Sequence, residues 1–131
     1  QKSYYQQCKK EATAQIEFLG KKNHQEISTL LSQSKVHAMP SFYETTGLAS
    51  LEALYNGCQV VVSNRGGQKE IFEDKALYCE PTDKDSIKEA IAKALAKKDN
   101  HRDWIKENFS WAKAAQSISD IYQTVINQPK V

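Results

Sequence analysis

Two glutamates, Glu44 and Glu52, stand on either side of the point where an apolar stretch gives way to a helical pattern. Carboxylates accept hydrogen bonds from hydroxyl groups, as acidic residues do for ribose in dinucleotide-binding folds. The free amides of a helix N-terminus bind phosphate, and Gly47, in the first predicted turn, lets an oxygen approach the backbone closely. We expect Thr45 or Thr46 to cap this helix. The pattern indicates a site for a sugar hydroxyl, a diphosphate and a ribose, with both carboxylates facing one cavity.

Strand and helix patterns alternate along the rest of the chain. The run Val60–Val62 is β-branched and continuous, as expected for a strand that is covered on both faces. Apolar residues at helical spacing mark the helices, and Asp83 or Asp85 is expected to cap one of them. The predicted strands are 16–20, 35–40, 60–62 and 76–79, and the predicted helices are 3–13, 25–34, 47–56, 68–72, 83–97, 101–108 and 111–127.

This alternation predicts an α/β fold with a Rossmann-like parallel sheet and helices on both of its faces. Ligands of such sheets bind beyond the carboxyl ends of the strands. Three segments, 40–47, 63–67 and 20–24, follow predicted strands and are expected at that edge. Their convergence predicts one site, which contains both glutamates.

The composition is that of an ordinary soluble domain, with 131 residues, 40% of them hydrophobic and 26% charged. A net charge of +2 argues against a nucleic-acid partner. No apolar run reaches the ~18 residues of a membrane span, and the chain opens without a secretory pattern. We therefore expect a cytoplasmic protein, or one held peripherally at the inner face of the membrane. Three cysteines and three histidines are scattered, which predicts reduced thiols and no metal site.

Several short motifs occur together along the chain, each weak alone and specific in combination. They are Phe18-Leu19-Gly20, Pro40-Ser41-Phe42-Tyr43-Glu44, Gly47-Leu48-Ala49-Ser50-Leu51-Glu52-Ala53, Gly57 to Ser63, Gly66-Gly67-Gln68-Lys69-Glu70-Ile71 and Phe109-Ser110-Trp111. With these motifs, the stretch from Ile16 to about Ala92 resembles the C-terminal, nucleotide-sugar-binding domain of retaining glycosyltransferases of the GT-B fold. The type is family 4, also called glycosyl transferases group 1.

The resemblance implies a hexosyltransferase that moves a sugar from a nucleotide diphosphate to an acceptor with retention of configuration, in bacterial polysaccharide or glycoconjugate biosynthesis. Glu44 is implied as the catalytic residue, which positions the donor sugar and supplies electrostatics rather than attacking carbon. Glu52 is implied to bind the ribose. The backbone at Thr46, Gly47 and Leu48 would meet the diphosphate and the sugar. Neither a cofactor nor a metal is implied.

The resemblance implies less specific roles for several other residues. Lys21 and Lys22 would lie near the base of the donor. Gly66 and Gly67 form a tight turn whose backbone also passes near the sugar, and Arg65 either reaches a phosphate or is a solvated loop residue. Phe42 and Tyr43 line the donor pocket or pack against the protein, and Glu70 supports a helix start or contacts ligand. Thr45 departs from the glycine that is common in the family, so the loop near the sugar differs in shape.

By the resemblance, residues 1–131 are one partial donor-binding domain, which lacks the first two strands and the acceptor domain and is inactive or nearly so alone. The segment 16–19 then loses its neighbouring strand. We expect it to pair beside 36–39, to exchange with a second copy of the chain, or to pair with strands of another polypeptide. The amphipathic helix 111–127 either packs on the core or crosses toward the other domain; its apolar stripe is Trp111, Ala115, Ile118, Tyr122 and Val125.

Two other functions fit the same fold. One is a different GT-B enzyme, of the phosphorylase or epimerase type, although the sequence shows no signature for a pyridoxal phosphate lysine. The other is a non-catalytic module that binds a nucleotide sugar or acts as a scaffold, against which Glu44 and Glu52 count. The base, the sugar and the acceptor are not specified by these residues.

Overall fold

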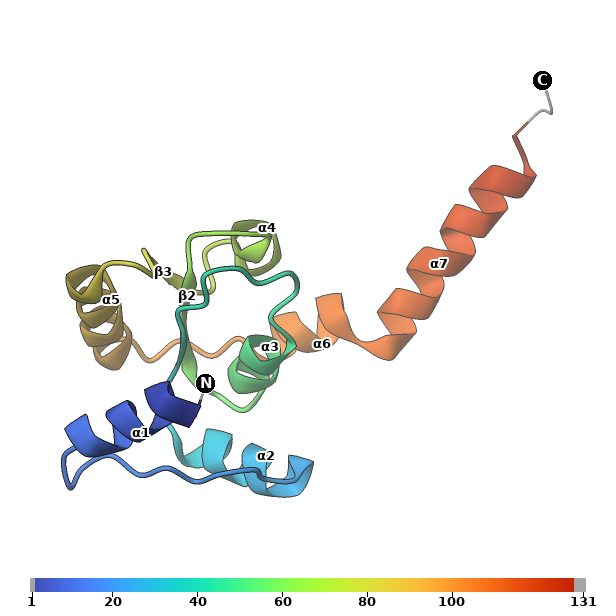
Figure 1. The fold of residues 1–131 in the computed structure, drawn as a ribbon. Coiled ribbons are helices and arrows are strands. Elements are labelled where there is room, and N and C mark those ends of the chain that lie inside the picture. The colour runs from blue at the N-terminus through green and yellow to red at the C-terminus, as the bar shows by residue number, and fades with distance from the viewer. Residues whose placement is uncertain (1, 129–131) are drawn as a thin grey trace.

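The fold is built on a small parallel sheet, and the computed structural model describes residues 2–128. Within this part of the chain the sheet has three strands in the order β1-β2-β3, namely β1 Val36–Met39, β2 Gln59–Ser63 and β3 Leu77–Cys79 (Figure 1). Each strand lies beside the next one along the chain, and both pairings are parallel. All three strands therefore end at the same edge of the sheet, and the predicted parallel α/β class is confirmed.

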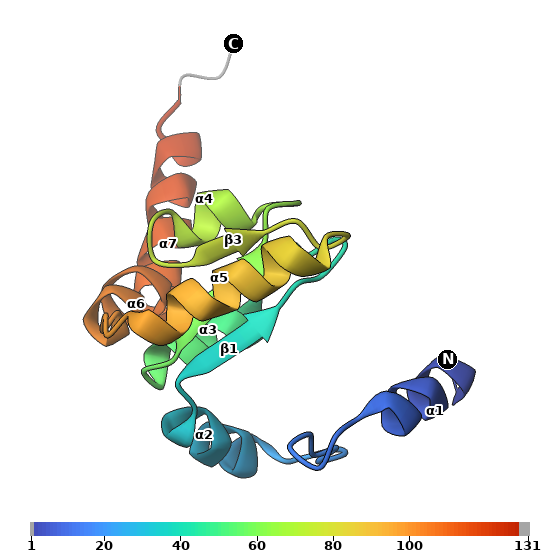
Figure 2. The ribbon, with the colours of Figure 1, turned by 90° about the vertical axis from the view of Figure 1, so that its left-hand side faces the viewer.

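Helices lie on both faces of this sheet. On one face lie α3 (Leu48–Tyr55) and α6 (Arg102–Phe109), and on the other lies α5 (Lys84–Ala96), which crosses the sheet in Figure 2. The helix α2 (His24–Gln33) precedes β1, and the short α4 (Gln68–Phe72) connects β2 to β3. Every predicted helix is present.

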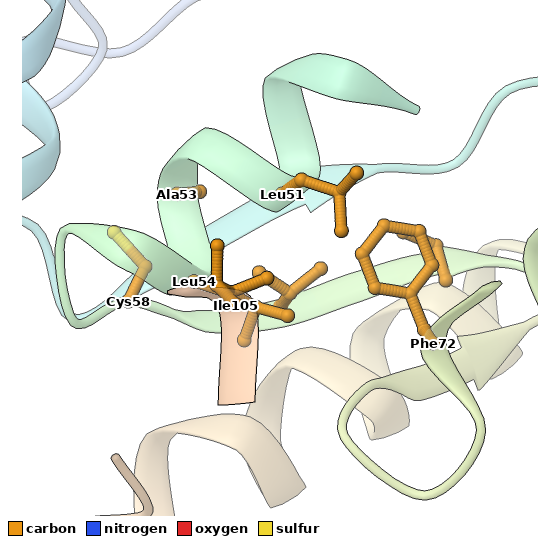
Figure 3. Close-up of a cluster of buried hydrophobic side chains, with 8 residues drawn as sticks. Leu51, Ala53, Leu54, Cys58, Phe72 and Ile105 are labelled. Carbon is orange, nitrogen blue, oxygen red and sulfur yellow. The ribbon is translucent and has the colours of Figure 1, made fainter. Parts of the chain in front are cut away.

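Alternate side chains of β2 point to the two faces and fill two separate cores. Val60 and Val62 pack on the α3 face, and Val61 packs on the α5 face. All three are buried because helices cover the sheet on both sides. The larger core is completed by Leu51, Ala53, Leu54, Cys58, Phe72 and Ile105 (Figure 3), and the smaller one by Cys79, Ala90 and Ala94.

Side-chain caps fix the starts of α2 and α5. Asn23 and Glu26 form a reciprocal capping box at the start of α2, in which each side chain accepts from the other residue's backbone amide at 2.9 Å. Asp83 accepts from the amides of Asp85 and Ser86 at the start of α5. Of the two aspartates predicted as the cap of that helix, the structure selects Asp83.

The strand predicted at 16–20 is wrong. This segment runs between α1 (Lys2–Glu11) and α2 without a strand partner in residues 2–128, so its pairing beside 36–39 is also contradicted. Its side chains pack locally instead, with the Phe18 ring edge-on to Tyr5 at 5.5 Å between centroids. An apolar run alone does not make a strand, because the backbone also needs a hydrogen-bonding neighbour. Exchange with a second copy, or pairing with another polypeptide, stays a prediction.

The helix α7 (Trp111–Ile126) extends away from the rest of the molecule (Figure 1). The large residues of its apolar stripe are exposed, from 52% at Ile118 to 93% at Trp111, so the expectation that it packs on the core is wrong. Its crossing toward another domain stays a prediction. Among the helices of residues 2–128, none is both long and apolar enough to cross a membrane.

Candidate functional site

Two loops meet at the carboxyl edge of the sheet, and two glycines let them approach. A Cβ on Gly66, whose φ is +69°, would lie 2.3 Å from the carbonyl oxygen of Glu44. A Cβ on Gly67 would lie 3.0 Å from the carbonyl oxygen of Thr45. Side chains at these positions would push the loops apart. The structure thus places both glycines, predicted near the donor sugar, directly against the backbone that carries Glu44.

The start of α3 is open to a ligand. Its N-cap is Gly47, at φ 69° and ψ 45°, without a side-chain cap, so the predicted cap by Thr45 or Thr46 is wrong. The carbonyl of Gly47 accepts from the amides of Ser50 and Leu51, one turn further into the helix, while the amides of Leu48 and Ala49 have no acceptor in the described chain. Both residues are exposed. Free amides and the positive end of the helix dipole suit this point to an anion.

The two glutamates lie on either side of this helix start. Glu44 is half-buried, and its Oε1 accepts from the amide of Thr45 at 2.9 Å. Glu52 is exposed on α3 and lines two cavities, of about 440 and 220 Å³. Glu44 is not among the lining residues of either cavity. That both carboxylates serve one ligand stays a prediction.

The smaller cavity lies between α2 and α3. His24, Ser28 and Leu31 line it from α2, and Glu52 and Asn56 from the α3 side. The Ser28 hydroxyl donates to Oδ1 of Asn56 at 3.1 Å and so links the two helices beside Glu52. The sequence reasoning missed His24, Ser28 and Asn56.

The predicted base-binding lysines lie elsewhere. Lys22 pairs with Glu26 at 3.4 Å and lines a third cavity, of about 310 Å³, with Leu19 and Thr29. Lys21 is exposed. The structure therefore does not bring these two lysines to the cavities lined by Glu52, and their contact with a base stays a prediction.

The larger cavity has an apolar, aromatic wall. Thr46, Leu48 and Glu52 contribute to it from the start and middle of α3. The opposite wall consists of residues from α6 and the first residue of α7. The sequence pattern near the glutamates does not predict that these distant residues line the cavity. The remaining lining residues are Leu51, Tyr55, Asn56, Ile105, Phe109 and Trp111.

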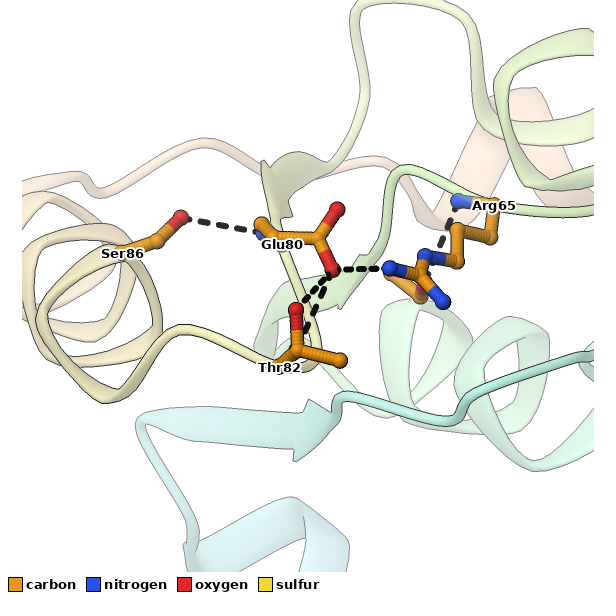
Figure 4. Close-up of polar contacts among 5 residues, drawn as sticks. Arg65, Glu80, Thr82 and Ser86 are labelled. Carbon is orange, nitrogen blue, oxygen red and sulfur yellow. Dashed lines mark hydrogen bonds and ion pairs between the residues drawn. The ribbon is translucent and has the colours of Figure 1, made fainter.

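A charged cluster joins the loops that follow β2 and β3 (Figure 4). Arg65 donates from Nη2 to Oε1 of Glu80 at 2.5 Å, and the same oxygen accepts from the Thr82 hydroxyl at 2.6 Å. The Thr82 hydroxyl, with smaller contributions from its amide and from Arg65, lowers the pKa of Glu80. Arg65 is thus an ion-paired residue rather than a purely solvated one. Glu80 was missed because this pairing is not visible in local sequence.

The side of α3 that faces the sheet is fixed to β1 by His37. Its Nε2 lies 3.1 Å from the hydroxyl of Ser50, which is fully buried. Burial lowers the pKa of His37, which favours a neutral ring. This contact joins the first turn of α3 to the second residue of β1.

Metal-ligand clusters are not apparent in the described chain. Across residues 2–128, no group of three or more His, Cys, Asp or Glu side chains is placed to hold a metal ion. Cys58 and Cys79 are buried, and burial raises the pKa of both thiols. That the reaction needs neither metal nor cofactor stays a prediction.

A parallel sheet with an open helix N-terminus at its carboxyl edge defines a Rossmann-like α/β domain. The chain belongs to the glycosyl transferases group 1 family, whose model matches residues 1–111. It is 31% identical over 82% of its length to an uncharacterized glycosyltransferase of Methanocaldococcus jannaschii. It is 30% identical over 80% of its length to glycogen synthase of Mycobacterium tuberculosis.

The chain matches only part of these proteins. It spans 30% of the Methanocaldococcus protein and 28% of the glycogen synthase. Among solved structures, sucrose-phosphate synthase from Thermosynechococcus elongatus matches with a TM-score of 0.79 at 24% identity, over 95% of this chain and 34% of that one. This likeness shows the fold alone.

Proposed function

We propose that this chain is the donor-binding part of a retaining hexosyltransferase, which moves a sugar from a nucleotide diphosphate to an acceptor. The observation that carries the proposal is the open start of α3, with free amides at Leu48 and Ala49 and with Glu44 and Glu52 on its two sides. This feature lies at the carboxyl edge of the sheet, in a chain of the glycosyl transferases group 1 family.

Each group at the helix start has a distinct role in this proposal. The amides near Gly47 and Leu48, with the backbone at Thr46, bind the diphosphate, where the helix dipole favours negative charge. Glu52 accepts hydrogen bonds from the ribose hydroxyls. Glu44 accepts from hydroxyls of the donor sugar, and its charge stabilises positive charge that develops at the anomeric carbon.

The supporting loops complete the donor site. Gly66 and Gly67 hold the backbone of Glu44 and Thr45 at the distance the sugar needs, since side chains there would displace it. In this proposal Lys21 and Lys22 contact the base once the donor is bound, and neither a metal nor a cofactor takes part. Positioning of this kind supplies a large part of the rate in group transfer.

A second domain supplies the acceptor side of the cleft. The chain spans less than a third of the length of the curated relatives named above. The acceptor, which is a glycan, a lipid or a small molecule, therefore contacts residues outside this chain. Residues 1–131 alone are then inactive or nearly so. The complete protein acts in polysaccharide or glycoconjugate biosynthesis in the cytoplasm.

The test is donor binding by the full-length protein. UDP-, GDP- and ADP-sugars are titrated by calorimetry, and one of them is expected to bind. Glu52→Ala should weaken that binding by ~1–3 kcal/mol, because charge-assisted hydrogen bonds to the ribose are lost. Glu89→Ala is the matched control, since Glu89 is exposed on α5, where it pairs with Lys93 at 2.7 Å. An unaltered protein that binds none of these sugars refutes the proposed function.

A further inference from the structure

One buried polar side chain lies directly beneath the proposed donor site. Gln68, the first residue of α4, is 1% exposed. Its Nε2 donates to the carbonyl oxygen of Thr45 at a long 3.4 Å. Its Oε1 is buried and has no hydrogen-bond partner in the described chain. Such an oxygen has lost its hydrogen bonds to water without gaining one within the protein, and this destabilises the folded state.

The Gln68 amide fills the space under the start of α3. A Cβ on Gly47 would lie 2.9 Å from Oε1 and 3.3 Å from Nε2 of Gln68. The adjoining glycines, Gly66 and Gly67, support the carbonyls of Glu44 and Thr45. The turn that carries the proposed sugar-binding carboxylate therefore rests on three consecutive residues, 66–68. Only the last of them has a side chain that can hydrogen-bond.

We propose that Gln68 is a positioning residue of the donor site, and that its free Oε1 accepts a backbone N–H of the 44–47 turn when donor is bound. The inference rests on the proposed function. Oε1 is closed off from solvent, so the donor itself does not reach it, and the turn must shift slightly to satisfy it. Donor binding and the new hydrogen bond then favour the same position of the turn.

This role has a signature that a purely structural role lacks. In the ligand-free protein the cost of the unpaired Oε1 outweighs the long 3.4 Å hydrogen bond from Nε2 to the Thr45 carbonyl, so replacing the amide does not lower stability. In the donor-bound protein Oε1 is paired, so removing it weakens binding. Stability and affinity therefore respond differently to the loss of the same amide, whereas a side chain that only supports the fold contributes to stability in both states.

The experiment replaces the amide by an apolar side chain of similar length. Gln68→Met, in the full-length protein, is expected to melt at the same temperature as the unaltered protein or higher. Its affinity for the UDP-, GDP- or ADP-sugar that binds should fall about tenfold, the loss of roughly one charge-neutral hydrogen bond. Affinity for the matching nucleoside diphosphate, which lacks the sugar, should fall less, because Glu44 then has no ligand.

Gln59→Met is the matched control. Gln59 is also a buried glutamine, at 7% exposure, but lies at the amino end of β2 and donates to the carbonyl of Asp99 at 2.7 Å. Its loss should lower the melting temperature and leave donor affinity unchanged. The inference about Gln68 is overturned, and the proposed function is not, if Gln68→Met melts at a lower temperature than the unaltered protein or binds the donor with the same affinity. Failure of the unaltered protein to bind any donor overturns the proposed function as well.

Discussion

Gly66→Ala separates the cost of backbone strain from the cost of moving Glu44. Gly66 has φ +69°, and a non-glycine residue in this region costs about 1–2 kcal/mol. The added Cβ also meets the Glu44 carbonyl oxygen at 2.3 Å, below any real contact of this kind. Relieving that overlap moves the Glu44 backbone by roughly 1 Å and costs about 1–3 kcal/mol more, as overpacking does.

Gly57→Ala provides the control, because Gly57 has φ +96° and a Cβ there would have no atom within 4 Å. It carries the strain of a positive φ without the overlap. Urea denaturation should show a loss of about 1–2 kcal/mol for Gly57→Ala and roughly 2–5 kcal/mol for Gly66→Ala.

Sugar transfer by the full-length protein measures the second effect. A misplacement of a catalytic group by about 1 Å can lower the rate on the order of 100-fold. The Gly66→Ala variant should therefore lose most of its transfer activity, whereas the Gly57→Ala variant should retain it. The reasoning is refuted if the two variants lose the same stability and the same activity. It is also refuted if Gly66→Ala is folded, destabilised and fully active.

Two further predictions concern buried groups. Burial lowers the pKa of His37 below its unfolded value near 6.5, so its contribution to stability is full above that pH and is lost as the pH falls through the folded pKa. The urea midpoint should therefore drop less between pH 7.5 and 5 in His37→Gln than in the unaltered protein, and equal drops would contradict the assignment. Ellman's reagent should react quickly with the half-buried Cys8 and slowly with Cys58 and Cys79, whose thiols are buried with raised pKa values. A rapid reaction that disappears in Cys58→Ser would count against this burial.

Local pattern predicted the parts of the fold whose causes are local. Val60–Val62 lies within β2, and the short helix Gln68–Phe72 has the predicted bounds. An aspartate before an apolar periodic stretch correctly placed the start of α5. In each case the side chains that decide the structure lie within a few residues of it.

The same reasoning failed where the cause lies elsewhere in the chain. The apolar run at 16–20 has no neighbouring strand, so it is not part of the sheet. Gly47 rather than a threonine is the N-cap of α3, at a position where a Cβ would meet the side chain of Gln68 from α4. The ion pair of Arg65 with Glu80 likewise joins two loops that only the folded sheet brings together.

The order of strands in the sheet bears on how the protein folds. Val36 pairs with Gln59 and Val61 with Leu77, so each parallel ladder closes over one short crossover. The entropic cost of loop closure grows with the logarithm of loop length, and folding slows as the sequence separation of contacts increases. In a nascent chain β1 can pair with β2 as soon as β2 has emerged, and β3 can be added afterwards. The three strands of the described residues can therefore assemble in the order in which they are synthesised.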